Sequence, residues 1–127
     1  MFDYTVETTN TIEETVQRLE ENLKQEQFGI LWQFDIKEKL EEKGLEFDDE
    51  YKVLEVCNPH EAQRVLQQNK MVGYFLPCKI VVYRDQGKTK VGMPKPSFLM
   101  DSINDSKLKE LAIDIEKRLI TCLDKSV

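Results

Sequence analysis

The chain has 127 residues, and 40% of them are hydrophobic, which is enough to bury the core of one domain without disulfides or a metal. We therefore expect a single domain over residues 1–127. The formal net charge of −6 argues against nucleic-acid binding, because the phosphate backbone requires a basic face. No apolar run approaches the ~20 residues that span a membrane, and the N-terminus lacks the pattern of a signal peptide. Three cysteines, an odd number, then indicate reduced thiols, so we expect a cytoplasmic protein with no membrane partner.

The first elements predicted are a strand and an amphipathic helix. Residues 2–6 alternate apolar and polar side chains, which is typical of a half-buried strand. Thr11 and Glu14 have the spacing of a capping box, so a helix should begin there and end near Gln27. The apolar face of this helix repeats at helical spacing and consists of Ile12, Val16, Leu19 and Leu23.

A second strand and a short helix follow. Residues 30–34 predict a strand, and we interpret Trp32 as a core aromatic residue of the sheet. Asp35 is a capping residue for a short helix, and Gly44 supplies the left-handed residue that ends it. The residues expected to face inward from this helix are Ile36 and Leu40.

The most informative stretch is residues 51–83, which predicts a strand, a helix, an apolar connection and another strand. The β-rich run of residues 53–56 is stopped by Cys57-Asn58-Pro59. Asn58 is a strong N-cap, because its side-chain oxygen can accept from the free N–H groups of the first turn. Pro59 fits the first helical position, where a missing N–H costs nothing.

Cys57 is the first candidate functional residue. It lies just outside a helix N-terminus, where the partial positive charge favours a thiolate. The alternative is that Cys57 is only a small apolar residue where a strand enters a turn. His60, the single histidine, falls on the first helical turn and is interpreted as a surface residue.

Leu76-Pro77-Cys78 forms the second joint and leads into the strand predicted for residues 79–83. If the two central strands were parallel, Cys57 and Cys78 would lie on the order of 20 Å apart. If residues 71–76 instead ran back along the helix in an extended form, the strands would be antiparallel and both thiols would meet at one edge. The sequence leaves both arrangements open.

The C-terminal third predicts a hairpin and a long helix. Residues 84–87 form the turn, residues 88–93 pair back, and Pro94 and Pro96 end the strand because they lack ladder donors. Asn104 or Ser106 should begin the last helix. Its inward stripe consists of Leu108, Leu111, Ala112, Ile115, Leu119, Cys122 and Leu123, so Cys122 is interpreted as a packing residue.

The Cys-Asn-Pro helix start and the Leu-Pro-Cys strand start, in this order, resemble the signature of the domain-of-unknown-function 302 family. The likeness extends over essentially the whole chain. The resemblance implies a small α+β domain, usually a dimer, with no established biochemical activity. Glu55 departs from the family pattern, in which a small residue is usual at this position, so the resemblance supports no role for Glu55.

Helices with one apolar stripe and strands of alternating pattern predict an α+β two-layer sandwich, with a mostly antiparallel sheet and helices packed on one face. The order is β-α-β-(α)-β-α-β-β-α. The uncovered face would be buried economically in a homodimer, and a cavity between two such sheets would suit a small-molecule ligand.

Two functional hypotheses follow from the two joints. The first is a noncatalytic dimeric module that binds a small ligand or a soft metal; its candidate binding residues are Cys57, Asn58, Pro59, Pro77 and Cys78. The second is a thiol-dependent enzyme or redox switch in which Cys57 reacts and Cys78 resolves. The enzyme hypothesis is the weaker, because Glu55 on the same strand face would raise the thiol pKa. A third hypothesis gives both motifs a purely architectural role.

Overall fold

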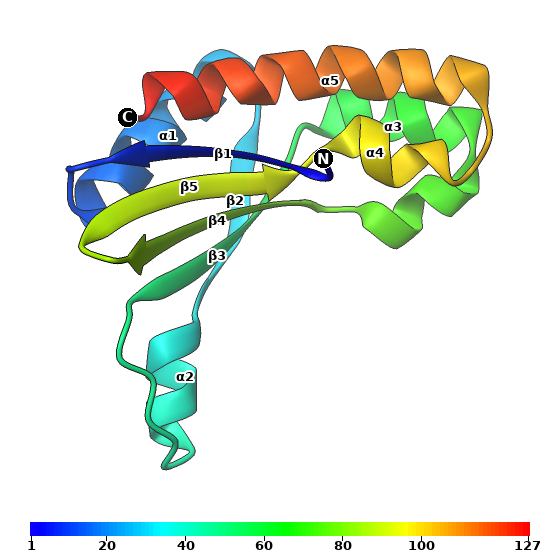
Figure 1. Ribbon diagram of the computed structural model, residues 1–127. Coiled ribbons are helices and arrows are strands. Elements are labelled where there is room, and N and C mark those ends of the chain that lie inside the picture. Colours follow the sequence, from blue (N-terminus) through cyan, green and yellow to red (C-terminus); the bar gives the residue numbers. More distant parts are fainter.

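The computed structural model describes residues 1–127 as two layers, a sheet covered on one face by helices (Figure 1). The sheet has five strands in the order β1-β5-β4-β3-β2, and every neighbouring pair is antiparallel. This confirms the predicted α+β sandwich. None of the helices combines the length and the apolar character needed to cross a membrane.

The elements follow the predicted order, with two short helices added over residues 70–75 and 96–101. The strands are β1 (Asp3–Thr8), β2 (Gly29–Asp35), β3 (Tyr51–Cys57), β4 (Cys78–Asp85) and β5 (Lys88–Pro94). The helices are α1 (Ile12–Gln25), α2 (Ile36–Glu42), α3 (Pro59–Gln68), the 3₁₀ helix η1 (Lys70–Phe75), α4 (Pro96–Asp101) and α5 (Ser106–Lys125).

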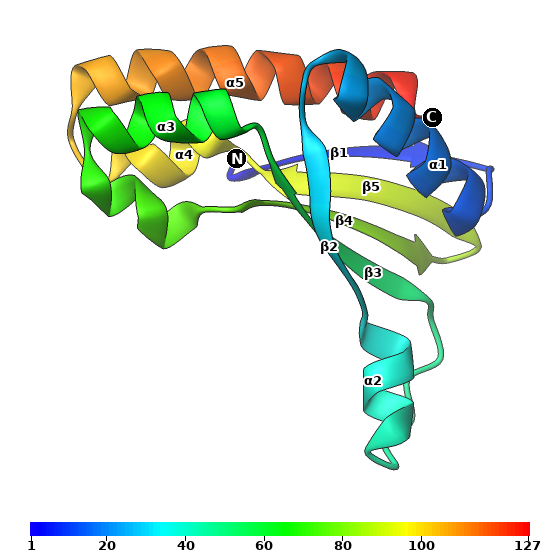
Figure 2. The same cartoon turned by 180° about the vertical axis from the view of Figure 1, so that it is seen from behind.

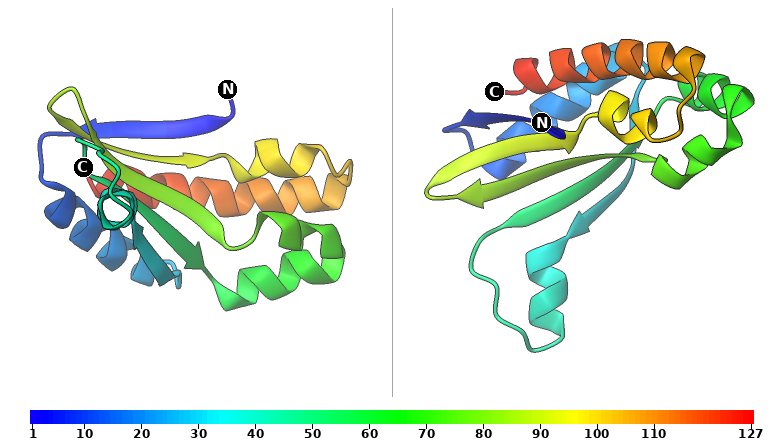
Figure 3. Two further views of the ribbon diagram at one scale, coloured as in Figure 1. Left: turned by 90° about the horizontal axis from the view of Figure 1, so that it is seen from below. Right: turned by 45° about the vertical axis from the view of Figure 1, so that its right-hand side comes forward.

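The core lies between the sheet and helices α1, α3 and α5. Alternate strand positions, such as Leu54 and Val56 on β3 and Ile80 and Val82 on β4, are fully buried under these helices. Burial of one such side chain stabilises the fold by roughly 1.5–3 kcal/mol. The helix contribution comes from the predicted stripes, which include Leu19, Leu23, Leu108, Leu119 and Leu123. Figure 3 shows the same one-sided layering from below and after a turn of 45° about the vertical axis.

The central strands are antiparallel, which decides between the two arrangements that the sequence left open. Val56 on β3 lies opposite Cys78 on β4. The connection after α3 is η1 and not the extended segment considered from the sequence, because Asn69 caps a new helical turn by accepting from the N–H of Met71. The chain therefore turns back through a compact helix.

The segment from α2 to the start of β3 projects from the sheet as an arm (Figure 2). We define the arm as residues 36–50. The prediction that Ile36 and Leu40 face inward is wrong, because α2 has no buried residue and the domain offers its apolar side no surface. Gly44 does end this helix with a left-handed φ of 77°.

One further expectation is corrected, and one is confirmed. Trp32 is not a core residue but is 59% exposed, because a register shift between Ile30 and Trp32 on the edge strand β2 changes the face on which it lies. Helix α5 begins at Ser106, one of the two predicted starts, and its N-cap is Asp105, whose carboxylate accepts from the N–H of Leu108.

Candidate functional site

The sheet separates between β4 and β5 at one end. The pairing of these strands stops at Val81 and Gly92, whereas β4 continues alongside β3 and β5 continues alongside β1. Beyond that point, η1, which precedes β4, and α4, which follows β5, lie on either side of the opening (Figure 1). The separation creates a cavity inside the sheet layer.

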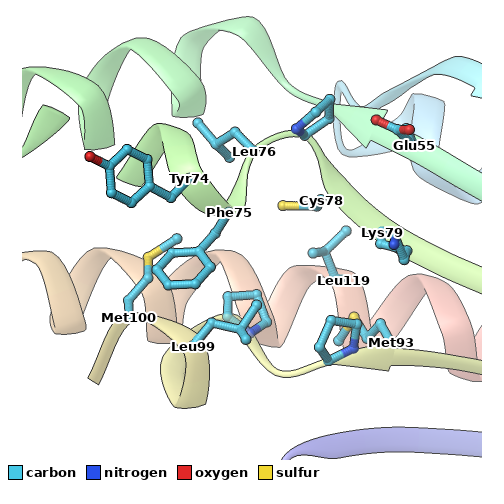
Figure 4. A pocket seen from close by; sticks show the side chains of 13 residues that line it. Glu55, Tyr74, Phe75, Leu76, Cys78, Lys79, Met93, Leu99, Met100 and Leu119 are labelled. Atoms are coloured by element: carbon cyan, nitrogen blue, oxygen red, sulfur yellow. The ribbon is translucent and has the colours of Figure 1, made fainter. Parts of the chain in front are cut away.

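This cavity has a volume of about 340 Å³, and we call it the split pocket. Its floor includes Leu119 of α5, and its walls come from the start of β4 and from the end of β5 with α4 (Figure 4). Most lining residues are hydrophobic, and the full set is Glu55, Tyr74, Phe75, Leu76, Pro77, Cys78, Lys79, Met93, Pro94, Pro96, Leu99, Met100 and Leu119.

Two backbone hydrogen bonds fix the direction of the peptide groups near the split pocket. Lys95 donates its N–H to the carbonyl of Phe2, so on β5 the peptide groups of alternate residues 91, 93 and 95 point to β1. Arg84 donates its N–H to the carbonyl of Glu50, so on β4 the groups of residues 80, 82 and 84 point to β3. The N–H and the C=O of Lys79 therefore both point towards β5.

Pro94 explains why the ladder cannot continue. Hydrogen-bonded pairs alternate along an antiparallel ladder, so the next one after Val81 and Gly92 would be Lys79 and Pro94. Its two hydrogen bonds would require an N–H on each residue. Proline has no N–H, so the Lys79 carbonyl has no donor across the opening. No loop backbone group donates to this carbonyl either. An unpaired acceptor thus lies on the wall of the split pocket.

The charged side chains at the rim come from neighbouring strands. Glu55 on β3 lies opposite Lys79 on β4 in the register, and both line the split pocket. They do not form an ion pair with each other, whereas ten other ion pairs do form in the molecule. Both head groups are available to a bound molecule.

The two predicted joints meet at the edge of this region. Val56 lies opposite Cys78, and Cys57 is the next residue on β3. Standard strand spacings place its Cα about 6 Å from the Cα of Cys78. Both thiols are free, and both line a second, apolar cavity of about 20 Å³, which has room for one water molecule. The cysteines are close enough in Cα separation for a disulfide.

Burial keeps the two thiols protonated. It raises the pKa of Cys57, in the opposite direction to the helix N-terminus effect expected from the sequence. Burial, with a smaller effect from the neighbouring Cys57, raises the pKa of Cys78 to about 11. Neither environment activates a thiolate near neutral pH.

The comparisons with known proteins agree with the sequence resemblance. The model of the family described as "Domain of unknown function DUF302" matches residues 4–126. The chain belongs to this family. A solved structure described as an uncharacterized conserved protein DUF302 from Bacillus stearothermophilus is 60% identical, with a TM-score of 0.98 over 100% of this chain and 99% of that one. No curated protein matches.

Within this DUF302 chain, the five predicted binding residues fall into three groups. Pro77 and Cys78 line the split pocket, and Cys57, Asn58 and Cys78 line the small cavity. Pro59 lines neither and is exposed at the first position of α3. The structure therefore connects the Leu-Pro-Cys motif, more than the Cys-Asn-Pro motif, with the larger cavity.

Asn58 has an architectural role in this DUF302 fold. It is 3% exposed, its side-chain oxygen accepts from the N–H groups of His60 and Glu61, and its amide donates to the carbonyl of Glu26. These bonds cap α3 and tie its start to the end of α1. The polar atoms of Asn58 are thus already occupied.

A soft metal does not fit the side chains that one chain offers. Cys57 and Cys78 supply two sulfur ligands, and no group of three or more His, Cys, Asp or Glu side chains is placed to hold a metal ion. Structural sites for such ions take four ligands. The raised pKa of both thiols further opposes metal binding, because a metal requires the thiolate.

Most of the split pocket was not predicted from the sequence. Phe75, Met93, Leu99 and Met100 come from different connections and strands, yet they converge on one cavity. The available signal was Pro94, which correctly predicted the end of strand pairing. What the sequence did not reveal was that the partner strand β4 continues past that point.

Proposed function

We propose that this protein is a noncatalytic module that binds a small, mainly apolar molecule in the split pocket and works as a homodimer. The observation that carries the ligand proposal is the cavity of about 340 Å³ between separated strands, with Leu119 at its floor. A molecule with a short hydrocarbon body would replace water that apolar walls hold poorly.

The chemistry of the walls favours binding over catalysis. The nucleophilic side chain in the split pocket is Cys78, and its pKa of about 11 leaves it protonated at neutral pH. The one histidine, His60, is exposed on α3 and does not line the pocket, so Cys78 has no imidazole base beside it. These features support a thiol that packs against a ligand.

Methyl NMR tests the ligand proposal with an internal control. The chain has four methionines. Met93 and Met100 line the split pocket, whereas Met1 and Met71 do not and are 91% and 50% exposed. With ¹³C-methyl methionine labelling and 1-hexanol as the probe, we expect saturable shifts of the Met93 and Met100 signals while those of Met1 and Met71 stay in place.

A matched pair of variants locates the binding site. Leu99→Trp adds bulk at the wall of the split pocket and should abolish the saturable shifts. Leu45→Trp adds the same bulk on the arm, where Leu45 is 56% exposed, and should leave them unchanged. Equal hexanol binding by both variants would contradict the assignment of the ligand to this cavity.

The homodimer proposal rests on the sheet face that the helices leave open. Tyr51 and Tyr83 stack there with ring centroids 4.9 Å apart, and their strand neighbours Val53 and Val81 are only partly buried. A groove of about 220 Å³ crosses the same face beside the tyrosines. A second copy of the chain would cover these aromatic and β-branched side chains. The odd cysteine count supports a cytoplasmic location for this dimer.

A further inference from the structure

We infer that the head group of the ligand is an N–H donor, a primary amine or a primary amide, attached to the apolar body. This inference rests on the proposed binding function and adds the chemical class of the ligand. It follows from two acceptors at the split pocket that have no partner in the chain, the Lys79 carbonyl and the Glu55 carboxylate.

Three of the four prolines of the chain, Pro77, Pro94 and Pro96, line the split pocket, and none of them has an N–H. The Lys79 carbonyl is left without a donor because residue 94 is a proline. An unpaired acceptor next to a cavity costs free energy unless water or a ligand donates to it.

The rim adds a second acceptor. The carboxylate of Glu55 makes no ion pair, and Glu55 lines the same cavity as Lys79. Lys79 is exposed, so its flexible ammonium group can stay in water while its peptide carbonyl remains at the wall. A ligand N–H group can therefore bridge the Lys79 carbonyl and the Glu55 carboxylate. The N–H of Lys79 points in the same direction as its carbonyl and can donate to the oxygen of an amide head group.

Figure 4 places Tyr74 at the opposite end of the split pocket from Glu55 and Lys79, so its ring is not part of the head-group site. The Glu55 carboxylate forms a charge-assisted hydrogen bond with an ammonium group, which is stronger than one with a neutral amide. We therefore expect the amine to bind at least as tightly as the amide.

The test compares four six-carbon probes that differ only in the head group: hexylamine, hexanamide, 1-hexanol and sodium hexanoate. Dissociation constants come from the Met93 and Met100 methyl shifts at pH 7. We expect the dissociation constants of hexylamine and hexanamide to be lower than that of hexanoate by about fivefold or more. The dissociation constant of hexanol should lie between that of hexanoate and those of the two N–H donors. Tighter binding of hexanoate would overturn the inference, because it would make the Lys79 ammonium group the partner of the head group.

The variant Pro94→Ala tests the unpaired carbonyl directly. It returns an N–H to the position opposite Lys79, where that group either donates to the Lys79 carbonyl or faces the ligand as a donor. In both cases the preference for hexylamine over hexanoate should fall. Protection of the new backbone amide at position 94 from hydrogen exchange would identify the first case. An unchanged preference would contradict the role of the Lys79 carbonyl.

Glu55→Gln should reduce hexylamine binding and leave hexanol binding unchanged, because it removes charge but little volume. The control is Glu46→Gln, which makes the same change on the exposed arm and should have no effect. If none of the four probes moves the Met93 and Met100 signals, the proposed binding function itself fails. If hexanol binds but the amine and the amide bind no more tightly, only the inference about the head group fails.

Discussion

Helices α1 and α2 have similar sequence signals but very different surroundings. Each begins with a side-chain cap, Thr11 in α1 and Asp35 in α2, and each carries apolar residues at helical spacing. Leu19 of α1 is fully buried against the sheet, whereas Leu40 of α2 is only partly buried and α2 has no buried residue. An apolar stripe thus predicts a helix, but the stability it provides depends on what covers it.

The same comparison separates two kinds of function. The side of the sheet that carries α1 and α5 holds the core and the floor of the split pocket. The arm and the open sheet face carry exposed apolar side chains such as Leu45 and Trp32. We therefore expect substitutions on the first side to change folding and ligand binding, and those on the second to change the association of two chains.

The largest effect is expected for Leu19→Ala. It leaves a cavity in a fully buried position and should lower the free energy of unfolding by about 2–5 kcal/mol. Urea denaturation, followed by circular dichroism at one fixed protein concentration, measures the loss. A cost below about 1 kcal/mol would show that α1 is not packed as described.

A charge on the open sheet face should act on assembly. Tyr83→Glu replaces one ring of the stacked pair with Tyr51 and would bury a carboxylate at the proposed interface. We expect the dimer dissociation constant to rise by about tenfold or more, as measured by sedimentation velocity, with the methyl shifts caused by hexanol retained. A protein that is monomeric before the substitution would remove the basis of the dimer proposal.

Leu40→Ala is the partner experiment to Leu19→Ala. Both helices accept alanine readily, so the difference between the two variants reports packing and not helix propensity. In a free chain, Leu40→Ala should cost less than about 1 kcal/mol. A cost that grows with protein concentration would show that the arm packs against a second copy.

The sequence was a good guide where one local signal decides the structure. The Asn58 cap, the end of α2 at Gly44 and the stop at Pro94 all depend on a few neighbouring residues, and the structure contains each of them. The misplaced residues depended on distant contacts. Trp32 was misplaced by a bulge in an edge strand, and α2 by the lack of a surface to cover it.

The split pocket was out of reach of the sequence for the same reason. Its walls join residues 55, 74–79, 93–100 and 119, which are distant along the chain. Pro94 predicted a missing donor, but the identity of the acceptor it leaves unpaired, the Lys79 carbonyl, required the registers of three strand pairs. The sequence shows that residue 94 has no N–H to donate, and only the structure identifies the carbonyl that is left without a donor.

The smallest expected effect concerns the pKa values of the three cysteine thiols. Burial raises the pKa of Cys78 and of Cys122 to about 11, and it also raises the pKa of Cys57, from an ordinary value of 9.0. Because the folded state favours the neutral thiols, their contribution to stability is complete below pH 9 and is lost as the pH rises from 9 to about 11. Cys78→Ala should therefore lower stability more at about pH 8 than at about pH 11.

Alkylation with iodoacetamide, followed by peptide mass spectrometry, checks the same thiols one by one. In the folded protein at about pH 8 we expect Cys57 to react first, because Cys122 is buried and Cys78 has a pKa of about 11. In urea all three should react at similar rates. Fast alkylation of folded Cys78 at the same pH would mean a thiolate at the wall of the split pocket, and it would favour the thiol-dependent enzyme over the noncatalytic module.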